Sequence, residues 1–288
     1  MTAVSGATRL AAVIGDPARH SLSPALHNAA FRALELDWIY LAFDVARGEA
    51  VAALDAMRVL GIDGYSVTMP HKTDVARAVD ERSETAAALD AVNCVVRRDG
   101  RLVGHNTDGE GFLRGLRHDT GLDPAAARCV VIGAGGAARA VVLALAGAGA
   151  DEIVVVNRSP GPAAVAAALA GPIGRTGEAE AVAAADLIVN ATPIGMQRTA
   201  SAAPHGAPGD LPFPAGLLRA GHVVVDLVYD PLDTPLAAAA RAAGATAYNG
   251  LSMLVFQAAA AFERWTGLDA PAGAMLGAAA EAMARRRG

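Results

Sequence analysis

The sequence is poor in the residues that mark metal and disulfide proteins. Only 2 cysteines occur in 288 residues, Cys94 and Cys129, and each lies inside an apolar, strand-like run. This placement favours reduced, packed thiols over a disulfide or a metal site. The 7 histidines are scattered and include no His-x-x-x-His pair. We therefore predict that the protein has no metal centre.

Long apolar runs and cationic patches are also missing. No run of about 18 apolar residues free of glycine and charge occurs, and the N-terminus lacks the charged-then-apolar pattern of a signal peptide. The formal net charge is −5, and the only cluster of cations is Arg285-Arg286-Arg287. These features predict a cytoplasmic protein that binds neither membranes nor nucleic acid.

Apolar residues make up 53% of the chain, but aromatic residues only 4%. The core must therefore consist mainly of alanine, valine and leucine. A chain of this length can form two modest domains, each with its own core.

A β-branched run over residues 129–132 leads into the pattern Gly-x-Gly-x-x-Ala and then into a helix of small residues. Gly133 suits the tight turn, Gly135 lets the backbone approach a pyrophosphate, and Ala138 lets helix and strand pack closely. A second strand over residues 152–156 ends where such a fold contacts the ribose. This stretch predicts a dinucleotide-binding βαβ unit. The residues expected to face the pyrophosphate are Gly133, Ala134, Gly135, Gly136 and Ala137.

Strands and helices alternate on both sides of this unit, which predicts an α/β protein with mostly parallel sheets. Asp99-Gly100 favours a type I′ turn between two strands, and residues 197–214 are predicted to form a mobile loop over the site. The other expected strands cover residues 10–14, 38–44, 61–70, 186–190, 223–228 and 245–249, and the expected helices include 49–60, 251–265 and 272–285.

Four polar residues before the glycine-rich turn are candidates for chemistry. Ser23-Pro24 predicts a helix N-cap followed by proline, and Ser21 with Ser23 offers two hydroxyls for a carboxylate. Lys72 follows a strand end, where open α/β sheets bind ligands, and Asp108 begins a helix. From position alone, Lys72 could equally be a solvated surface lysine and Asp108 a helix cap. A Lys72–Asp108 pair is the sharper hypothesis.

Nine motifs, in order along nearly the whole chain, resemble those of the shikimate dehydrogenases and their quinate-using relatives. They are Gly15-x-Pro17-x-x-His20-Ser21-x-Ser23-Pro24-x-x-His27-Asn28, Val67-Thr68-x-Pro70-x-Lys72, Ala91-Val92-Asn93, Gly104-x-Asn106-Thr107-Asp108-x-x-Gly111, the Gly133 turn, Asn157-Arg158, Asn190-Ala191-Thr192-Pro193-x-Gly195-Met196, Asp226-x-Val228-Tyr229-x-Pro231-x-x-Thr234-Pro235-Leu236, and Gly250-x-x-Met253-Leu254-x-x-Gln257-Ala258 with Trp265-Thr266-Gly267.

The resemblance implies NADP-linked, reversible reduction of 3-dehydroshikimate to shikimate, a step of aromatic amino-acid biosynthesis. It makes Lys72 and Asp108 the expected catalytic pair. The substrate contacts that it implies are Ser21, Ser23, Thr68, Asn93, Tyr229 and Gln257. Further cofactor contacts that it implies are Asn157, Arg158, Thr192, Met196 and Gly250.

The resemblance also implies two domains. Residues 1–108 and 250–288 are expected to form the substrate-binding domain, and residues 109–249 a Rossmann-type NADP-binding domain. The last two helices are expected to return and pack on the first domain.

Two departures from the family pattern affect specificity. Ser66 stands where many members have asparagine. No second basic residue follows Arg158 within Ser159-Pro160-Gly161-Pro162. Asn157-Arg158, without an acidic residue, favours NADP because a carboxylate would repel the 2′-phosphate, but NAD remains an alternative cofactor.

Several alternatives stay open from the sequence. Quinate or an aminoshikimate could replace shikimate as substrate. A non-catalytic dinucleotide sensor would share the fold, and a folate-linked dehydrogenase of similar plan would also use a lysine. Family members occur as monomers and as homodimers, so both states are open.

Overall fold

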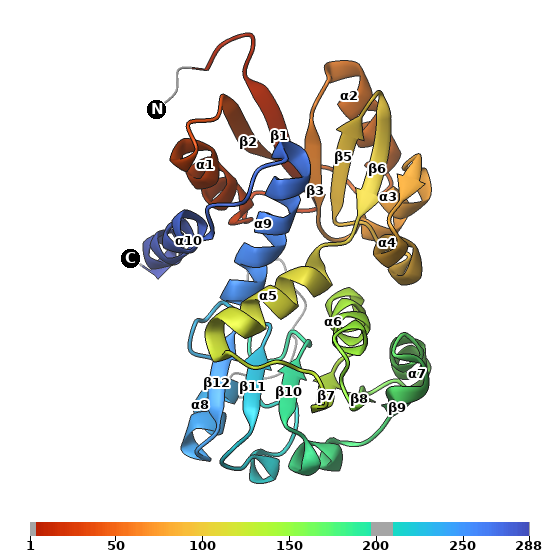
Figure 1. Ribbon diagram of the computed structural model, residues 1–288, viewed down its shortest axis with the longest axis vertical. Helices are drawn as coiled ribbons and strands as arrows, with labels where there is room; N and C mark the ends of the chain where they lie inside the picture. Colours follow the sequence, from red (N-terminus) through yellow and green to blue (C-terminus); the bar gives the residue numbers. More distant parts are fainter. Residues whose placement is uncertain (1–3, 197–209, 288) are drawn as a thin grey trace. The chain divides into compact units, whose positions relative to one another are not determined.

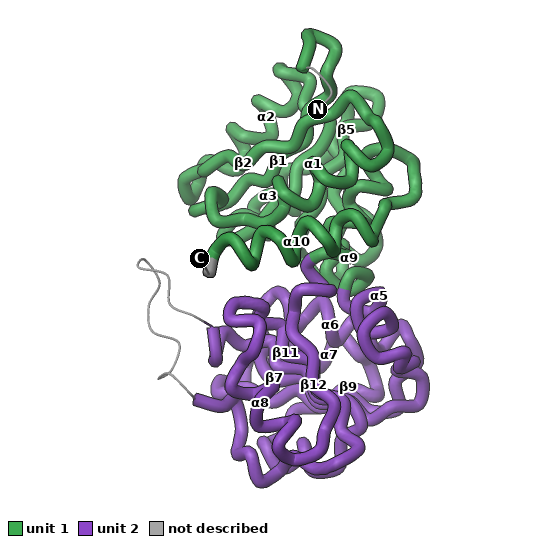
Figure 2. Tube along the Cα trace, turned by 90° about the vertical axis from the view of Figure 1, so that its left-hand side faces the viewer, with its two compact units in different colours: residues 1–111, 255–288 green, residues 112–254 purple. Residues whose placement is uncertain are grey.

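The computed structural model describes residues 4–196 and 210–287 (Figure 1). The chain divides into two compact units, which Figure 2 colours separately. Unit 1 comprises residues 1–111 and 255–288, and unit 2 comprises residues 112–254. The expected boundaries, after residues 108 and 249, fall at the starts of helices α5 (Asp108–Thr120) and α9 (Leu251–Thr266). Each of these helices begins in one unit and ends in the other.

Unit 1 is built on a mixed sheet with the strand order β2-β1-β3-β5-β6-β4. β1 pairs in parallel with β2 and β3, whereas β5 runs antiparallel to β3 and β6. The strands are β1 (Arg9–Gly15), β2 (Trp38–Asp44), β3 (Gly64–Val67), β4 (Glu81–Arg82), β5 (Cys94–Arg98) and β6 (Arg101–His105). The helices lying wholly in unit 1 are α1 (Ser23–Ala33), α2 (Ala50–Leu60), α3 (Lys72–Ala78), α4 (Glu84–Leu89) and α10 (Ala272–Arg287).

The predicted hairpin turn is confirmed. Arg98 pairs with Arg101 across it, and Asp99 and Gly100 both have positive φ, at 52° and 78°. These backbone angles are those of the type I′ turn that aspartate-glycine favours. Because the chain reverses here, the segment before β5 and the segment after β6 lie side by side at the same end of the two strands.

The C-terminal helices pack on unit 1, as expected. Trp265 of α9 lies directly on Gly64, where a Cβ atom would come within 2.3 Å of the indole nitrogen. That nitrogen donates a hydrogen bond to the carbonyl of Val95 at 3.0 Å. A side chain at position 64 would therefore displace the helix that carries Gln257.

His27 of α1 is fully buried and stacks on Tyr40, with ring centroids 4.3 Å apart. Among the described residues neither of its ring nitrogens has a hydrogen-bond partner. Burial alone lowers the pKa of His27 to about 3. The imidazole therefore behaves as a neutral core group at physiological pH.

This burial predicts an acid-sensitive fold. Below pH 6.5, the ordinary pKa of histidine, the unfolded chain binds a proton that folded His27 does not. Stability from His27 is thus present above that pH and is lost as pH falls, by up to about 1.4 kcal/mol per pH unit. Urea unfolding at several pH values should show this slope, and His27→Leu should flatten it. An unchanged slope in the variant would contradict the prediction.

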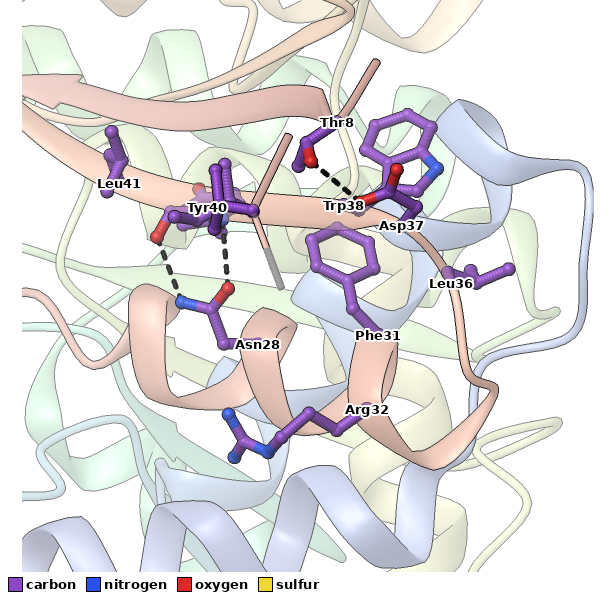
Figure 3. Close-up of a pocket in the computed structure, with 11 residues that line it drawn as sticks. Thr8, Asn28, Phe31, Arg32, Leu36, Asp37, Trp38, Tyr40 and Leu41 are labelled. Carbon is purple, nitrogen blue, oxygen red and sulfur yellow. Dashed lines mark hydrogen bonds between the residues drawn. The ribbon is translucent and has the colours of Figure 1, made fainter. Parts of the chain in front are cut away.

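Strand β2 is one of the two edge strands of the unit 1 sheet, and Asn28 of α1 binds it. The Asn28 side chain accepts a hydrogen bond from the backbone N–H of Tyr40 and donates one to its carbonyl, both at 2.9 Å. A cavity of about 250 Å³ lies beside this contact (Figure 3). Its lining includes Phe31, Arg32 and Trp38 and none of the predicted substrate residues.

Unit 2 is a parallel sheet with the order β12-β11-β10-β7-β8-β9, the doubly wound Rossmann arrangement. Its strands are β7 (Arg128–Ile132), β8 (Glu152–Val156), β9 (Gly174–Thr176), β10 (Leu187–Asn190), β11 (Val223–Asp226) and β12 (Thr246–Asn249). Its helices are α6 (Gly136–Gly147), α7 (Pro160–Ala168) and α8 (Pro235–Ala242), with short 3₁₀ turns at Gly171–Ile173, Ala179–Ala184 and Ala215–Leu217. The predicted α/β fold class is therefore confirmed.

Other sequence predictions have mixed outcomes. Cys94 and Cys129 are buried free thiols, as predicted, and burial raises the pKa of each to about 12. The loop predicted over residues 197–214 lies, as far as residue 209, outside the described residues. Within the described ranges, no helix is both long and apolar enough to cross a bilayer.

Candidate active site

The candidate substrate residues of unit 1 gather at one end of its strands, the carboxyl ends of β1 and β3. β1 and β3 are parallel, so the N-terminus of α1 and the residues after β3 lie at their carboxyl ends. β5 runs antiparallel to β3, so Asn93, which precedes β5, lies beside Val67 at the end of β3. The backbone N–H of Val67 donates a hydrogen bond to the carbonyl of Asn93 at 2.8 Å. β6 then returns to that end of the sheet and leads into Asp108, the first residue of α5.

Lys72 is the first residue of α3, a helix that sequence patterning did not predict. Its backbone carbonyl accepts a hydrogen bond from the N–H of Val92 at 2.9 Å. The preceding His71 is fully buried, and its Nε2 lies 2.7 Å from the carbonyl of Val45. The start of α3 is therefore tied to two other segments of unit 1, which fixes the origin of the lysine side chain.

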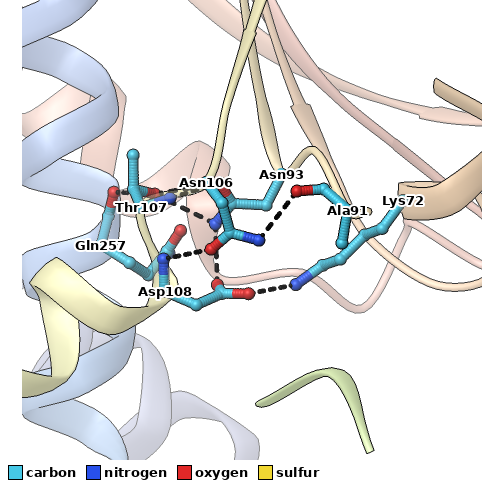
Figure 4. Close-up of polar contacts among 7 residues, drawn as sticks. All are labelled: Lys72, Ala91, Asn93, Asn106, Thr107, Asp108 and Gln257. Carbon is cyan, nitrogen blue, oxygen red and sulfur yellow. Dashed lines mark hydrogen bonds and ion pairs between the residues drawn. The ribbon is translucent and has the colours of Figure 1, made fainter. Parts of the chain in front are cut away.

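The predicted pairing of Lys72 with Asp108 is present in the structure (Figure 4). Lys72 Nζ lies 2.6 Å from Asp108 Oδ2, and the two side chains are 26% and 10% exposed. The second carboxylate oxygen, Oδ1, accepts a hydrogen bond from Asn93 Nδ2 at 2.7 Å. Such charge-assisted bonds in a partly desolvated place are stronger than surface ion pairs. The carboxylate thus holds the ammonium group of a partly exposed lysine side chain in one orientation.

Asn93 connects this pair to α9. Its Oδ1 accepts from the backbone N–H of Thr107 at 2.8 Å, and its Nδ2 donates to the Thr107 hydroxyl at 3.0 Å. That hydroxyl in turn donates to the backbone carbonyl of Gln257 at 3.0 Å. Gly111 makes this approach feasible, since a Cβ there would lie 2.5 Å from the backbone nitrogen of Gln257. The structure therefore brings Gln257 to the Asn93 cluster across a long stretch of sequence.

The two serines differ from the prediction in their local roles. Ser23 was expected to cap α1, but it is the first helical residue, and Leu22, which occupies the N-cap position, makes no side-chain capping bond. Instead, Ser21 Oγ accepts from the backbone N–H of Ser23 at 3.1 Å. The hydroxyl two residues upstream satisfies this N–H, as Ser and Thr do in turns. Ser21 and Ser23 nevertheless both lie at the helix start, where anions are favoured.

Thr68 follows β3 at the same end of the sheet. Its methyl group occupies the space beside Gly15, where a Cβ atom would come within 2.4 Å of it. Its backbone is held between β1 and the turn into α3, since its N–H donates to Ile14 and its carbonyl accepts from His71. The remaining predicted substrate contact, Tyr229, belongs to unit 2 and follows β11.

The predicted cofactor turn has the required backbone in unit 2. Gly133 has φ of 110°, and a Cβ there would lie 3.0 Å from the carbonyl oxygen of Ala191. Helix α6 starts at Gly136 with no capping side chain in the described part of the chain and no acidic residue in its first turn. A Cβ at Gly135 or Gly136 would meet no described atom within 4 Å. This open helix N-terminus fits a pyrophosphate.

The other predicted cofactor residues lie at strand ends of unit 2. Asn157 follows β8 and its amide donates to the carbonyl of Ser159 at 3.0 Å, while Arg158 is exposed. Thr192 and Met196 follow β10. At Gly250 a Cβ atom would lie 2.0 Å from the carbonyl oxygen of Leu227, the residue that follows β11. Packing against this residue therefore requires glycine at position 250, whatever its role in cofactor binding.

Several polar residues at these strand ends belong to the family motifs, but sequence reasoning assigned them no role. Asn106 accepts from the N–H of Asp108 at 3.1 Å and donates to the carbonyl of Ala91 at 3.0 Å. Thr107 joins Asn93 to Gln257, as described above. In unit 2, Asn190 and Asp226 are buried and bonded to each other. The sequence carried a signal for both residues, because Asn190 and Asp226 each end an apolar strand run, where α/β sheets place polar functional groups.

Comparison with known proteins agrees with this arrangement. Residues 13–95 match a family model for the shikimate dehydrogenase substrate binding domain. Residues 250–279 match one for the shikimate 5′-dehydrogenase C-terminal domain. Residues 128–207, which include the Gly133 turn, match a model for coenzyme F420-dependent NADP oxidoreductases.

Curated relatives match along the whole chain. A shikimate dehydrogenase (NADP(+)) of Moorella thermoacetica is 44% identical over 298 residues, with 100% of this chain and 98% of the relative covered. One of Methanopyrus kandleri is also 44% identical, with 93% of each chain covered.

Solved structures are similar over the same extent. A shikimate dehydrogenase in complex with NADP+ has a TM-score of 0.89 at 35% identity, with 98% of each chain covered. The Thermus thermophilus enzyme with NADP(H) and shikimate has a TM-score of 0.86 at 37% identity, with 95% of this chain and 99% of the other covered. Quinate dehydrogenase from Corynebacterium glutamicum with NAD has a TM-score of 0.85 at 34% identity, with 95% and 99% covered. The chain belongs to the shikimate dehydrogenase family.

Proposed function

We propose that the protein catalyses the reversible, NADP-dependent reduction of 3-dehydroshikimate to shikimate. The observation that carries the proposal is the 2.6 Å contact between Lys72 and Asp108, beside the amide of Asn93. A ketone that receives a hydride develops negative charge on its oxygen, so the site needs a proton donor there. When bound, NADPH supplies the hydride.

In this proposal Lys72 Nζ donates its proton to the substrate oxygen, and Asp108 holds the ammonium group in place. Ser21 and Ser23 donate hydrogen bonds to the substrate carboxylate. The neutral groups that bind the ring hydroxyls are Thr68, Asn93 and Gln257, with Tyr229 from unit 2 near the carboxylate. Neutral hydrogen-bonding groups suit a polyol because an analogue lacking a hydroxyl leaves them unpaired.

For the cofactor we propose that residues 133–137 and the start of α6 bind the pyrophosphate. Asn157 and Arg158 bind the adenosine ribose with its 2′-phosphate, and Thr192, Met196 and Gly250 line the rest of the site. The exposed position of Arg158 and the uncapped N-terminus of α6 support this assignment.

Removing Arg158 should narrow the preference for NADP over NAD. Arg158→Ala is expected to raise the Kd for NADP+ by roughly 10-fold, because one charge-assisted phosphate contact is lost, and to leave the Kd for NAD+ unchanged. Calorimetric titration with both dinucleotides measures this. Arg175→Ala is the matched control, since the Arg175 side chain pairs with Glu152 at 2.6 Å in the same unit. Equal losses for the two dinucleotides would contradict the prediction.

The proposed function is tested by steady-state oxidation of shikimate, quinate and an aminoshikimate, each with NADP+ and NAD+. We expect the highest kcat/KM with shikimate and NADP+. A higher kcat/KM with quinate or the aminoshikimate would show that shikimate is not the preferred substrate. A higher kcat/KM with NAD+ would show that NADP+ is not the preferred cofactor. Tight NADP+ binding without turnover of any of the three would indicate a dinucleotide sensor. The expected cytoplasmic location and monomeric or homodimeric state are tested separately, by fractionation and gel filtration.

A further inference from the structure

A buried amide–carboxylate pair joins two strand ends of unit 2. Asn190 is the last residue of β10, Asp226 is the last residue of β11, and the two are register partners. Both are fully buried, and Asn190 Nδ2 donates to Asp226 Oδ1 at 2.8 Å. The other residues of these two strands are leucine, isoleucine and valine. Buried charged and polar groups are costly unless they are paired, and apolar residues of similar size would stabilise such a core at least as well.

The other contacts of Asn190 shape the turn that follows β10. Its Oδ1 accepts from the backbone N–H of Thr192 at 3.0 Å and from the Thr192 hydroxyl at 2.7 Å. Its Nδ2 also lies 3.3 Å from the carbonyl oxygen of Ile194. Because the Thr192 hydroxyl proton is used in this contact, the orientation of that side chain is set by Asn190.

Asp226 holds a second turn with the same oxygen atom. Its Oδ1 accepts from the backbone N–H of Val228 at 3.1 Å, the residue before Tyr229. The other oxygen, Oδ2, is buried and has no hydrogen-bond partner of good geometry among the residues described. Burial raises the pKa of Asp226, against the opposing effects of Thr234, the Val228 N–H and Asn190. The two hydrogen bonds of Oδ1 therefore go to the turns after β10 and β11, and the carboxyl also interacts with the hydroxyl of Thr234, the N-cap residue of α8.

We propose that Asp226 is a positioning residue for both ligands of the reaction. Through Asn190 it fixes the turn that carries Thr192 toward the cofactor, and through the Val228 N–H it fixes the peptide that carries Tyr229 toward the substrate. This inference rests on the function proposed above, because it takes Thr192 and Tyr229 as ligand contacts. Asp226 itself touches neither ligand in this assignment.

The main experiment replaces the carboxyl with an apolar group of similar size. Asp226→Leu is expected to raise the Kd for NADP+, measured by calorimetry, and the KM for shikimate, each by roughly 10-fold to 100-fold, since two turns lose their common acceptor. Asp226→Asn keeps an oxygen that accepts from both donors, and its two values should stay within about threefold of wild type. Rescue by asparagine separates the positioning role from a need for the negative charge.

A second variant separates the two turns. Asn190→Leu releases the Thr192 turn but leaves the Asp226–Val228 contact, so the Kd for NADP+ should rise while the KM for shikimate stays near wild type. If Asp226→Leu does not fold, Asn190→Leu still tests the arm that runs to the cofactor. Val224→Ala is the control for general destabilisation, since Val224 is fully buried in β11 but outside both turns. Its Tm should fall with both ligand constants unchanged.

Three results would overturn the inference: unchanged ligand constants in Asp226→Leu, failure of Asp226→Asn to restore them, or equal changes in Val224→Ala. A wild-type enzyme that does not oxidise shikimate would instead refute the proposed function. The calorimetric Kd for NADP+ would in that case still test the arm of the inference that runs through Asn190.

Discussion

Lys72→Ala is expected to lower kcat for shikimate oxidation by roughly 10²-fold to 10⁴-fold, the range found when a general acid–base group is lost. Alanine cannot deliver or accept the proton at the substrate oxygen. The nearest carboxylate, Asp108, is held by Asn93 at 2.7 Å and keeps that orientation without the lysine. Steady-state rates with saturating shikimate and NADP+ measure the loss.

Two comparisons make this result specific. The Kd for NADP+ should not change, because the predicted cofactor residues lie in unit 2 and Lys72 lies in unit 1. Arg77→Ala removes another cation from the same helix, one that is exposed and pairs with Asp90 at 3.5 Å. Its turnover should match wild type. Near-normal turnover of Lys72→Ala would remove Lys72 from the mechanism.

Asp108→Asn is expected to lower kcat/KM by roughly 10²-fold, because the charge-assisted bond that orients Lys72 becomes an amide facing an ammonium group. Asparagine keeps the size of the side chain and one oxygen for Asn93. Losing one partner of a partly buried ion pair also destabilises the fold. Thermal unfolding, measured beside the rates, should therefore show a lowered Tm.

The control for Asp108→Asn is the same change at another ion-paired carboxylate of unit 1. Asp90 pairs with Arg77 and Arg82, but its side chain is 45% exposed. Surface pairs of this kind contribute about 0–1 kcal/mol, so Asp90→Asn should alter neither kcat/KM nor Tm appreciably. Equal behaviour of the two variants would mean that Asp108 acts as an ordinary surface carboxylate.

Much of unit 2 could be predicted from local sequence signals. The Gly133 turn, the β-branched run before it and the alternation after it follow from turn chemistry and periodicity alone. Strand β9 was missed because Gly174–Thr176 is too short to carry a period. Strand β4 and helices α3 and α4 in unit 1 were missed for the same reason.

The candidate site was less accessible to sequence reasoning. Position alone left Lys72 and Asp108 as surface and capping residues, because their pairing depends on the β5–β6 hairpin, which brings the chain back to the end of the sheet where β3 ends. Gln257 lies 150 residues from Thr107 in the chain, and only tertiary packing brings them together. The family resemblance supplied these residues, whereas Ser23 was assigned the wrong local role because α1 begins one residue earlier than expected, with Leu22 in the N-cap position.

The contact between Asn28 and strand β2 has a consequence for aggregation. An edge strand of a sheet presents free N–H and C=O groups that can template pairing with a strand of another molecule. At Tyr40, in the middle part of β2, the Asn28 amide already occupies one donor and one acceptor. An incoming strand would have to displace it before it could pair along this edge. Asn28 therefore obstructs the addition of a further strand at the β2 edge of unit 1.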